Sequence, residues 1–133
     1  MVVRTRVHPV VSFRASVLDV SRERPNPINP IYGESLLRWI AERWRGESAM
    51  SDPAPEDWGW YAYVSWDGSR YMLGASCSDM EAGEREWVLQ VVKSRTLGER
   101  LLGRNKMVAD DGCLRELLRV LKTESAFHGI TVT

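Results

Sequence analysis

The alternation of apolar and polar residues divides the chain into short strands, two amphipathic helices and polar loops. Residues 10–20 alternate loosely between β-branched or aromatic side chains and polar ones, which predicts a first strand. Pro25, Pro27 and Pro30 follow, and each proline fixes φ and removes a hydrogen-bond donor. Residues 22–30 should therefore form a stiff, extended loop.

Two helices are predicted from apolar residues at positions i, i+3, i+4 and i+7. The first should cover residues 34–45, and the second should begin at a cap formed by Asp110 or Asp111, whose carboxylate can accept from exposed amides. Residues 96–107 are predicted to form a short helix or a packed loop. The two apolar stripes consist of Leu37, Ile40, Ala41 and Trp44, and of Leu114, Leu117, Leu118 and Leu121.

The clearest local signal is a β-hairpin over residues 58–77. The Asp67-Gly68 pair at its centre supplies the two residues with positive φ that a type I′ turn requires. A two-residue turn then pairs the residues before it, in order, with those after it, as far as Trp58 opposite Cys77. The register of the hairpin follows from this turn alone.

The hairpin has two different faces, because side chains two residues apart in a strand point the same way. Trp58 and Trp60 are predicted to pack beneath the helices. Tyr61, Tyr63 and Met72 fall on the opposite face. In a fold of two layers no helix covers that second face, so we expect a sizeable apolar patch there, of the kind that marks a binding surface.

The remaining strands complete an α+β domain. Residues 84–93 are apolar at both parities, which predicts a central strand or one covered on both faces, and residues 130–133 should form a short closing strand. We therefore expect one domain over residues 1–133, a two-layer sandwich with a mainly antiparallel sheet of about five strands and two helices on one face. This plan is a variant of the split βαβ, ferredoxin-like arrangement.

The charge balance adds information about partners. The 133 residues have a formal net charge of zero, which gives no global attraction to nucleic acid or anionic lipid, so neither is expected as a partner. The charge is nevertheless segregated: residues 1–45 have eight Arg and four acids, residues 46–90 two Arg and nine acids, and residues 91–133 eight Lys or Arg and five acids. This pattern fits neutralisation within one fold or a complementary surface for self-association.

The cysteines and the apolar runs bear on location. Cys77 and Cys113 are far apart, and no secretory leader or run of roughly 20 apolar residues occurs, so we expect a cytoplasmic protein with two free thiols. No metal-ligand spacing is present, and no cofactor is expected. The excess of Arg over Lys, 15 against 3, is common in proteins of GC-rich bacterial genomes, and a cargo gene on a mobile element is consistent with such a chain.

Three groups of residues could carry chemistry. Glu56 and Asp57 lie beside indole rings, where desolvation could raise a carboxyl pKa for acid–base work, although a solvated strand entry is the simpler interpretation. His8 and His128 could titrate near neutrality, but nothing in the sequence places them together. Cys113 falls in the first turn of the last predicted helix, where a packed, unreactive thiol is the better interpretation.

Three hypotheses of function follow. The first is a non-catalytic binding or assembly module that forms a homodimer, or docks another protein, through an interface of Tyr61, Tyr63, Arg70 and Met72. The second is a small-molecule binding or sensor domain. Its pocket would be lined by Tyr32, Glu56, Asp57, Trp58 and Trp60. The third, with the least support, is an enzyme that uses Glu56 or Asp57 as acid or base.

Overall fold

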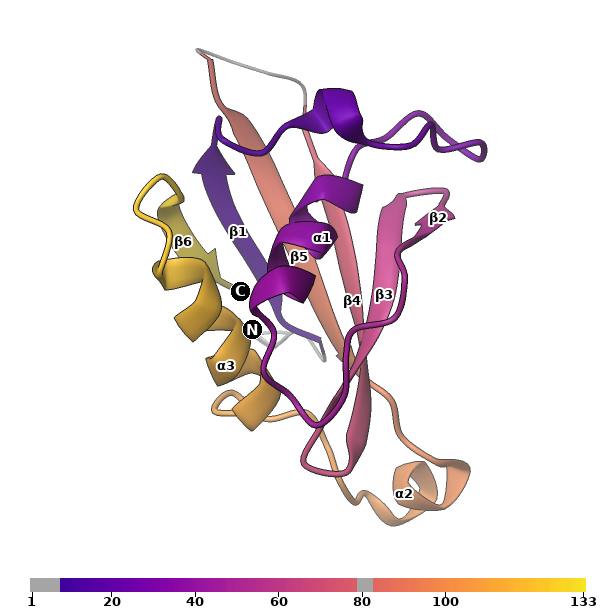
Figure 1. The fold of residues 1–133 in the computed structure, drawn as a ribbon. Coiled ribbons are helices and arrows are strands. Elements are labelled where there is room, and N and C mark those ends of the chain that lie inside the picture. Colours follow the sequence, from indigo (N-terminus) through magenta and orange to yellow (C-terminus); the bar gives the residue numbers. More distant parts are fainter. Residues whose placement is uncertain (1–7, 79–82) are drawn as a thin grey trace, which may run out of the picture.

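A computed structural model describes residues 8–78 and 83–133 and has one six-stranded antiparallel sheet with helices on one of its faces (Figure 1). The strand order is β2-β3-β4-β5-β1-β6. The strands are β1 (Val10–Ala15), β2 (Ala54–Glu56), β3 (Gly59–Trp66), β4 (Ser69–Cys77), β5 (Arg85–Lys93) and β6 (His128–Val132). The helices are α1 (Glu34–Arg43), α2 (Leu97–Leu102) and α3 (Gly112–Lys122), with a 3-10 turn η1 (Val20–Arg22).

The predicted α+β class is confirmed, and two details of the sheet differ from expectation. The additional strand, β2, lies in a segment for which no strand was predicted and pairs with the start of β3. The first strand, β1, lies between β5 and β6 but runs antiparallel to β5, whereas a split βαβ unit would make this pair parallel. The added strand accounts for the difference. Strands β2 to β5 are four consecutive antiparallel strands, so β5 runs opposite to β2. With this even number of strands, β5 lies antiparallel to β1 instead of parallel to it.

The central hairpin has the predicted register. Asp67 and Gly68 have φ values of 48° and 75°, as a type I′ turn requires. The pairs extend from Trp66 with Ser69 next to the turn to Trp60 with Ala75. Strand β5 then pairs with the other edge of β4, so it is central, as its apolar pattern predicted.

The core lies between the sheet and the helices α1 and α3, which Figure 1 shows in front of it. Trp60, Leu73 and Trp87 come from three neighbouring strands and are at most 1% exposed. Leu37 of α1 and Leu117 of α3 pack against this side and are fully buried. Burying such side chains stabilises the fold by about 1.5–3 kcal/mol each, which makes this layer its main source of stability.

The two predicted amphipathic helices are present with small differences. Helix α1 ends at Arg43, so Trp44 is its extended C-terminal cap, and Ala41 is exposed instead of packed. Of the two predicted cap candidates of α3, Asp110 and Asp111, it is Asp111 that accepts a hydrogen bond from the amide of Leu114, at 3.1 Å. The buried side chains of α3 also include Cys113 and Val120, which widens its apolar face beyond the predicted stripe.

The segment predicted as a short helix or packed loop forms α2, which projects from the end of the molecule near the hairpin turn (Figure 1). A capping box starts it: Thr96 Oγ1 accepts from the Glu99 amide, and the Glu99 carboxylate accepts from the Thr96 amide. Its leucines do not pack on the core, because Leu97 and Leu101 are 73% and 77% exposed. Local capping, rather than burial, therefore determines where this helix forms.

Glu34 fastens the proline-rich loop to the start of α1. Its carboxylate is almost fully buried and accepts hydrogen bonds from the Arg24 amide and guanidinium, with Arg38 at 3.3 Å. Burial alone would raise the pKa of Glu34, but the Arg24 hydrogen bonds and the two guanidinium charges outweigh it and lower the pKa below its ordinary value. The loop is thus held by a charged group rather than by regular structure.

Candidate functional site

The face of the sheet opposite the helices carries a cluster of aromatic side chains. Strand alternation places Tyr61 and Tyr63 of β3 here, and the β3–β4 register puts Met72 directly opposite Tyr63. Arg70 is two residues before Met72 on β4 and is exposed, whereas the other three are half-buried. All four residues of the predicted interface therefore lie together on this face, which we call the open face.

Ring contacts order the open face. The rings of Tyr61 and Tyr63 meet edge to face, with centroids 5.7 Å apart. The Arg70 guanidinium carbon lies 3.7 Å from the Tyr63 ring centroid, a cation–π contact. No helix of the described residues covers these rings, so the contacts between them hold them in place, and their edges form a preorganised surface that loses little freedom on binding.

Trp58 also lies on the open face, which corrects the prediction that it points to the helices. Strand β3 begins only at Gly59, whose φ is 148°, so Trp58 belongs to the preceding turn and does not follow the strand alternation. Its ring covers Gly74: a Cβ added there would be 2.6 Å from the indole. The absence of a side chain at Gly74 provides the space for the ring. The glycine is visible in the sequence, but the alternation of side chains along a strand does not indicate which ring fills the space beside it.

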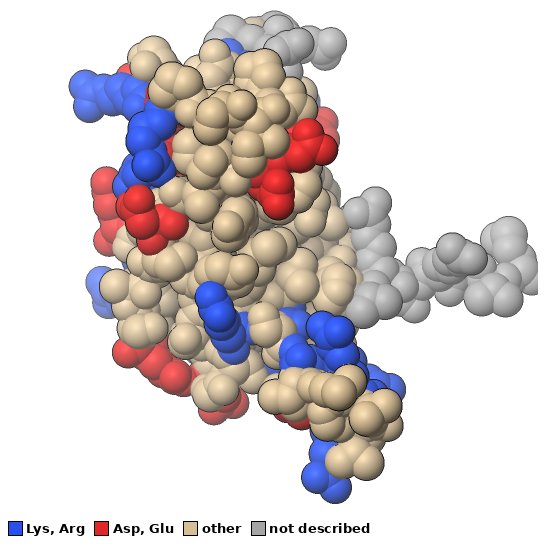
Figure 2. Space-filling model, turned by 90° about the vertical axis from the view of Figure 1, so that its right-hand side faces the viewer, with Lys and Arg blue, Asp and Glu red and all other residues tan. Residues whose placement is uncertain are grey.

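The open face has opposite charges at its two ends. Glu56 and Asp57 precede β3, and Glu86 lies near the start of β5, so these carboxylates share the end of the sheet where β4 finishes. Arg14 lies opposite Glu86 and offsets part of this charge. Arg70, by contrast, lies at the hairpin-turn end, beside the basic segment that carries α2. In the right half of Figure 2, most red groups lie above the blue groups around α2.

The residues predicted to line a ligand pocket do not surround one cavity, because Trp58 and Trp60 are on opposite faces of the sheet. Trp60 is 1% exposed within the core and donates from its indole nitrogen to the carbonyl of Ile31, while Trp58 lies on the other face. Tyr32 is exposed beneath Arg85, whose guanidinium carbon is 5.2 Å from its ring centroid. Two indoles on opposite sides of one sheet cannot line the same cavity.

The acid–base candidates have no orienting partner nearby among the described residues. The Glu56 carboxylate accepts from the Asp57 amide, as a carboxylate does in a tight turn, and Asp57 is exposed. The two histidines lie at opposite ends of the β1–β6 pair, because His8 precedes β1 whereas His128 is paired with Arg14 near its end. A catalytic pair of these groups has no geometric support.

Cys113 is inert by position. It is fully buried, and burial, together with the carboxylates of Asp111 and Glu116, raises the pKa of its thiol to about 12. A thiol so protonated at neutral pH is a weak nucleophile. The interpretation of Cys113 as a packed side chain fits this environment.

A buried polar cluster that the sequence analysis missed lies between β4 and α3. Tyr71 donates from its hydroxyl to Asp111 Oδ2 at 2.7 Å, and Lys93 Nζ lies 3.7 Å from the same oxygen. Burial, followed by the hydrogen bond to Asp111, raises the pKa of Tyr71. The only sequence signal for this cluster was Asp111, whose capping role was predicted but whose second partner on β4 depends on tertiary packing.

Comparisons with known proteins found no family model, curated protein or solved structure that matches the chain. A proposal of function therefore depends on the features described above. Within residues 8–78 and 83–133, no three His, Cys, Asp or Glu side chains are grouped to hold a metal ion. Over the same residues, no helix has the length and apolar character needed to span a membrane.

Proposed function

We propose that this chain is a non-catalytic assembly module that forms a homodimer through the open face around Tyr61, Tyr63, Arg70 and Met72. The observation that carries the proposal is the ordered ring cluster on a sheet face that none of the helices in residues 8–78 and 83–133 covers. Tyr, Trp, Met and Arg are the residue types enriched at interfaces, and two large rings with few rotatable bonds bind at low entropic cost.

A second copy of the chain is favoured as the occupant by the charges at the two ends of the open face. When two sheets stack face to face about a two-fold axis, with strands running in opposite directions, each end of one copy meets the other end of its partner. The carboxylates of Glu56 and Glu86 would then approach Arg70 of the second copy. A single self-complementary surface would satisfy both ends at once.

Sedimentation velocity across a range of protein concentrations tests the proposal. The wild-type protein should sediment as a dimer at micromolar concentration. Tyr63→Glu should give a folded monomer, because it removes the central ring of the interface and puts a charge there that must be desolvated on association. Tyr32→Glu is the matched control: this tyrosine also has an arginine over its ring but lies outside the open face, and the variant should remain dimeric.

Two outcomes would overturn the proposal. One is a wild-type protein that stays monomeric at about 100 μM, well above the micromolar concentration at which the dimer is expected. The other is a Tyr63→Glu variant that dimerises as well as the wild type. Circular dichroism of each variant separates loss of association from loss of folding.

A further inference from the structure

A cavity of about 660 Å³ lies at the end of the sheet away from the carboxylates of the open face. Its walls come from the start of β1, the ends of β5 and β6, the beginning of α3 and the segment that joins α2 to α3. Its volume is within the range that suits small-molecule sites. None of the residues predicted for a pocket lines it.

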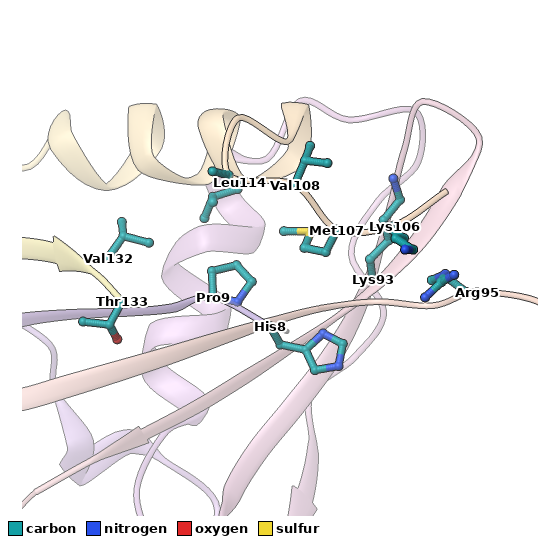
Figure 3. Close-up of a pocket in the computed structure, with 11 residues that line it drawn as sticks. His8, Pro9, Lys93, Arg95, Lys106, Met107, Val108, Leu114, Val132 and Thr133 are labelled. Carbon is teal, nitrogen blue, oxygen red and sulfur yellow. The ribbon is translucent and has the colours of Figure 1, made fainter. Parts of the chain in front are cut away.

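The cavity has a cationic end and an apolar end. Figure 3 shows Lys93, Lys106 and Arg95 gathered at one end, with Leu114 and Val132 toward the other. None of the described residues that line it has a carboxylate side chain. A molecule with an anionic head and an apolar body therefore matches the lining at both ends.

Lys93 is the most specific feature of the cationic end. Its side chain is only 11% exposed, yet its Nζ is 3.7 Å from Asp111 Oδ2, which is an ion pair beyond hydrogen-bond distance. The two oxygens of Asp111 already accept from Tyr71 and from the Leu114 amide. No described residue accepts a hydrogen bond from Lys93, so its three donors remain available in the cavity.

The neighbouring groups explain how this end is held rigid. Arg95 donates to the carbonyls of Arg104 and Glu99, each at 3.1 Å, and so fixes the segment that follows β5 against α2. Lys106 is exposed at the rim and can turn toward a ligand. The arrangement combines one largely buried ammonium, held near Asp111, with one exposed ammonium.

We propose that this cavity binds a monocarboxylate with an apolar body, with the carboxylate at Lys93 and Lys106 and the apolar part along Leu114 and Val132. A single negative charge is preferred, because Asp111 already balances part of the charge of Lys93. The carboxylate would supply the acceptors that Lys93 lacks, as a charge-assisted hydrogen bond in a partly buried site. This ligand site is separate from the open face, so it does not depend on self-association.

Titration with octanoate, followed by calorimetry and by amide chemical shifts, tests the proposal. Octanoate should bind and shift the amides of β5 and the α2–α3 segment. Octan-1-ol, which lacks the charge, and acetate, which lacks the apolar body, should each bind at least about tenfold more weakly. Absence of octanoate binding at about 1 mM, or equal binding of octan-1-ol, would overturn the proposal.

Variants at the cationic end assign the carboxylate contact. Lys93→Met and Lys106→Met should each weaken octanoate binding by about tenfold or more and leave octan-1-ol binding unchanged. If Lys93→Met proves unstable, Lys106→Met still tests the contact, because Lys106 is exposed and its replacement should leave the fold intact. Lys122→Met, an exposed lysine of α3 outside the cavity, is the control and should bind as the wild type.

A pair of variants at the apolar end isolates the electrostatic contribution. Val132→Glu and Val132→Gln remove the same apolar contact and differ in one negative charge. The Glu variant should bind octanoate several-fold more weakly than the Gln variant, by an amount that shrinks as salt is added. Equal affinities for the two variants, or wild-type affinity in both lysine variants, would contradict the assigned site.

Discussion

The two faces of the sheet are built from the same strands but hold their aromatic side chains in different ways. On the covered face Trp60 and Trp87 are enclosed by helices and the exposed fraction falls to 1% or less. On the open face Tyr61 and Tyr63 are only half-buried, and ring and cation–π contacts order them instead. Alternation along a strand assigns each side chain to a face, whereas the helices determine whether that face becomes a core or a surface.

The largest expected difference between the faces is in stability. Trp87→Ala should lower the free energy of unfolding by about 3–5 kcal/mol, because it leaves a cavity in a densely packed layer. Tyr63→Ala, measured at a concentration where the protein is monomeric, should cost no more than about 1 kcal/mol. Urea denaturation of both variants checks this contrast. Similar losses would mean that the open face is part of the folding core.

Glu34 allows a test of what anchors α1 to the loop before it. The pKa of Glu34 is lowered in the folded protein, so its carboxylate contributes stability above the ordinary Glu pKa, and this contribution disappears as the pH falls through the folded value. Glu34→Gln should therefore be about 2 kcal/mol less stable at pH 7, and the difference from the wild type should shrink as the pH falls through the lowered pKa of Glu34. Glu42→Gln, exposed on the same helix, is the control. A gap that stays constant with pH would contradict this assignment.

Gly74 tests the position of Trp58 on the open face. An alanine Cβ would meet the indole at 2.6 Å, so Gly74→Ala should displace the ring and lower the free energy of unfolding by only about 1 kcal/mol, since the ring lies at the surface and can move. Fluorescence quenching by acrylamide should increase. Ser76→Ala, on the same face of β4, is the control and should leave quenching unchanged. Gly68→Ala would not serve, because the positive φ of Gly68 strains an alanine there.

Arg70 should have the smallest effect on the isolated chain. Arg70→Ala removes an exposed cation–π contact, so the free energy of unfolding should fall by only about 0.5–1 kcal/mol. If the open face is an interface, the dimer dissociation constant should nevertheless rise by about tenfold or more, because arginine is among the residues that dominate binding energy. Arg115→Ala, exposed on α3, should change neither quantity.

The sequence predicted local features better than tertiary ones. The type I′ turn at Asp67-Gly68 determines the hairpin register, and the Asp111 cap determines the start of α3, because both depend on residues within a few positions of each other. Strand β2 and its pairing with β3 were missed, because three residues that include Pro55 carry no strand pattern.

The candidate site divides in the same way. The interface residues Tyr61, Tyr63, Arg70 and Met72 share one face because alternation within a hairpin is a local property. The position of Trp58 depended on a turn, and the Lys93–Asp111 contact joins a strand end to a helix start far along the chain. Contacts of that kind arise from tertiary packing, and the periodicity of apolar residues in the sequence does not predict them.

Intermolecular nuclear Overhauser effects in a mixed sample of labelled and unlabelled chains test the assembly surface most directly. The dimer proposed here predicts cross-peaks between the Met72 methyl group of one copy and the rings of Tyr61 or Tyr63 in the other. Their absence at a concentration where sedimentation shows a dimer, or cross-peaks from residues of α1 and α3 instead, would contradict a role for the open face.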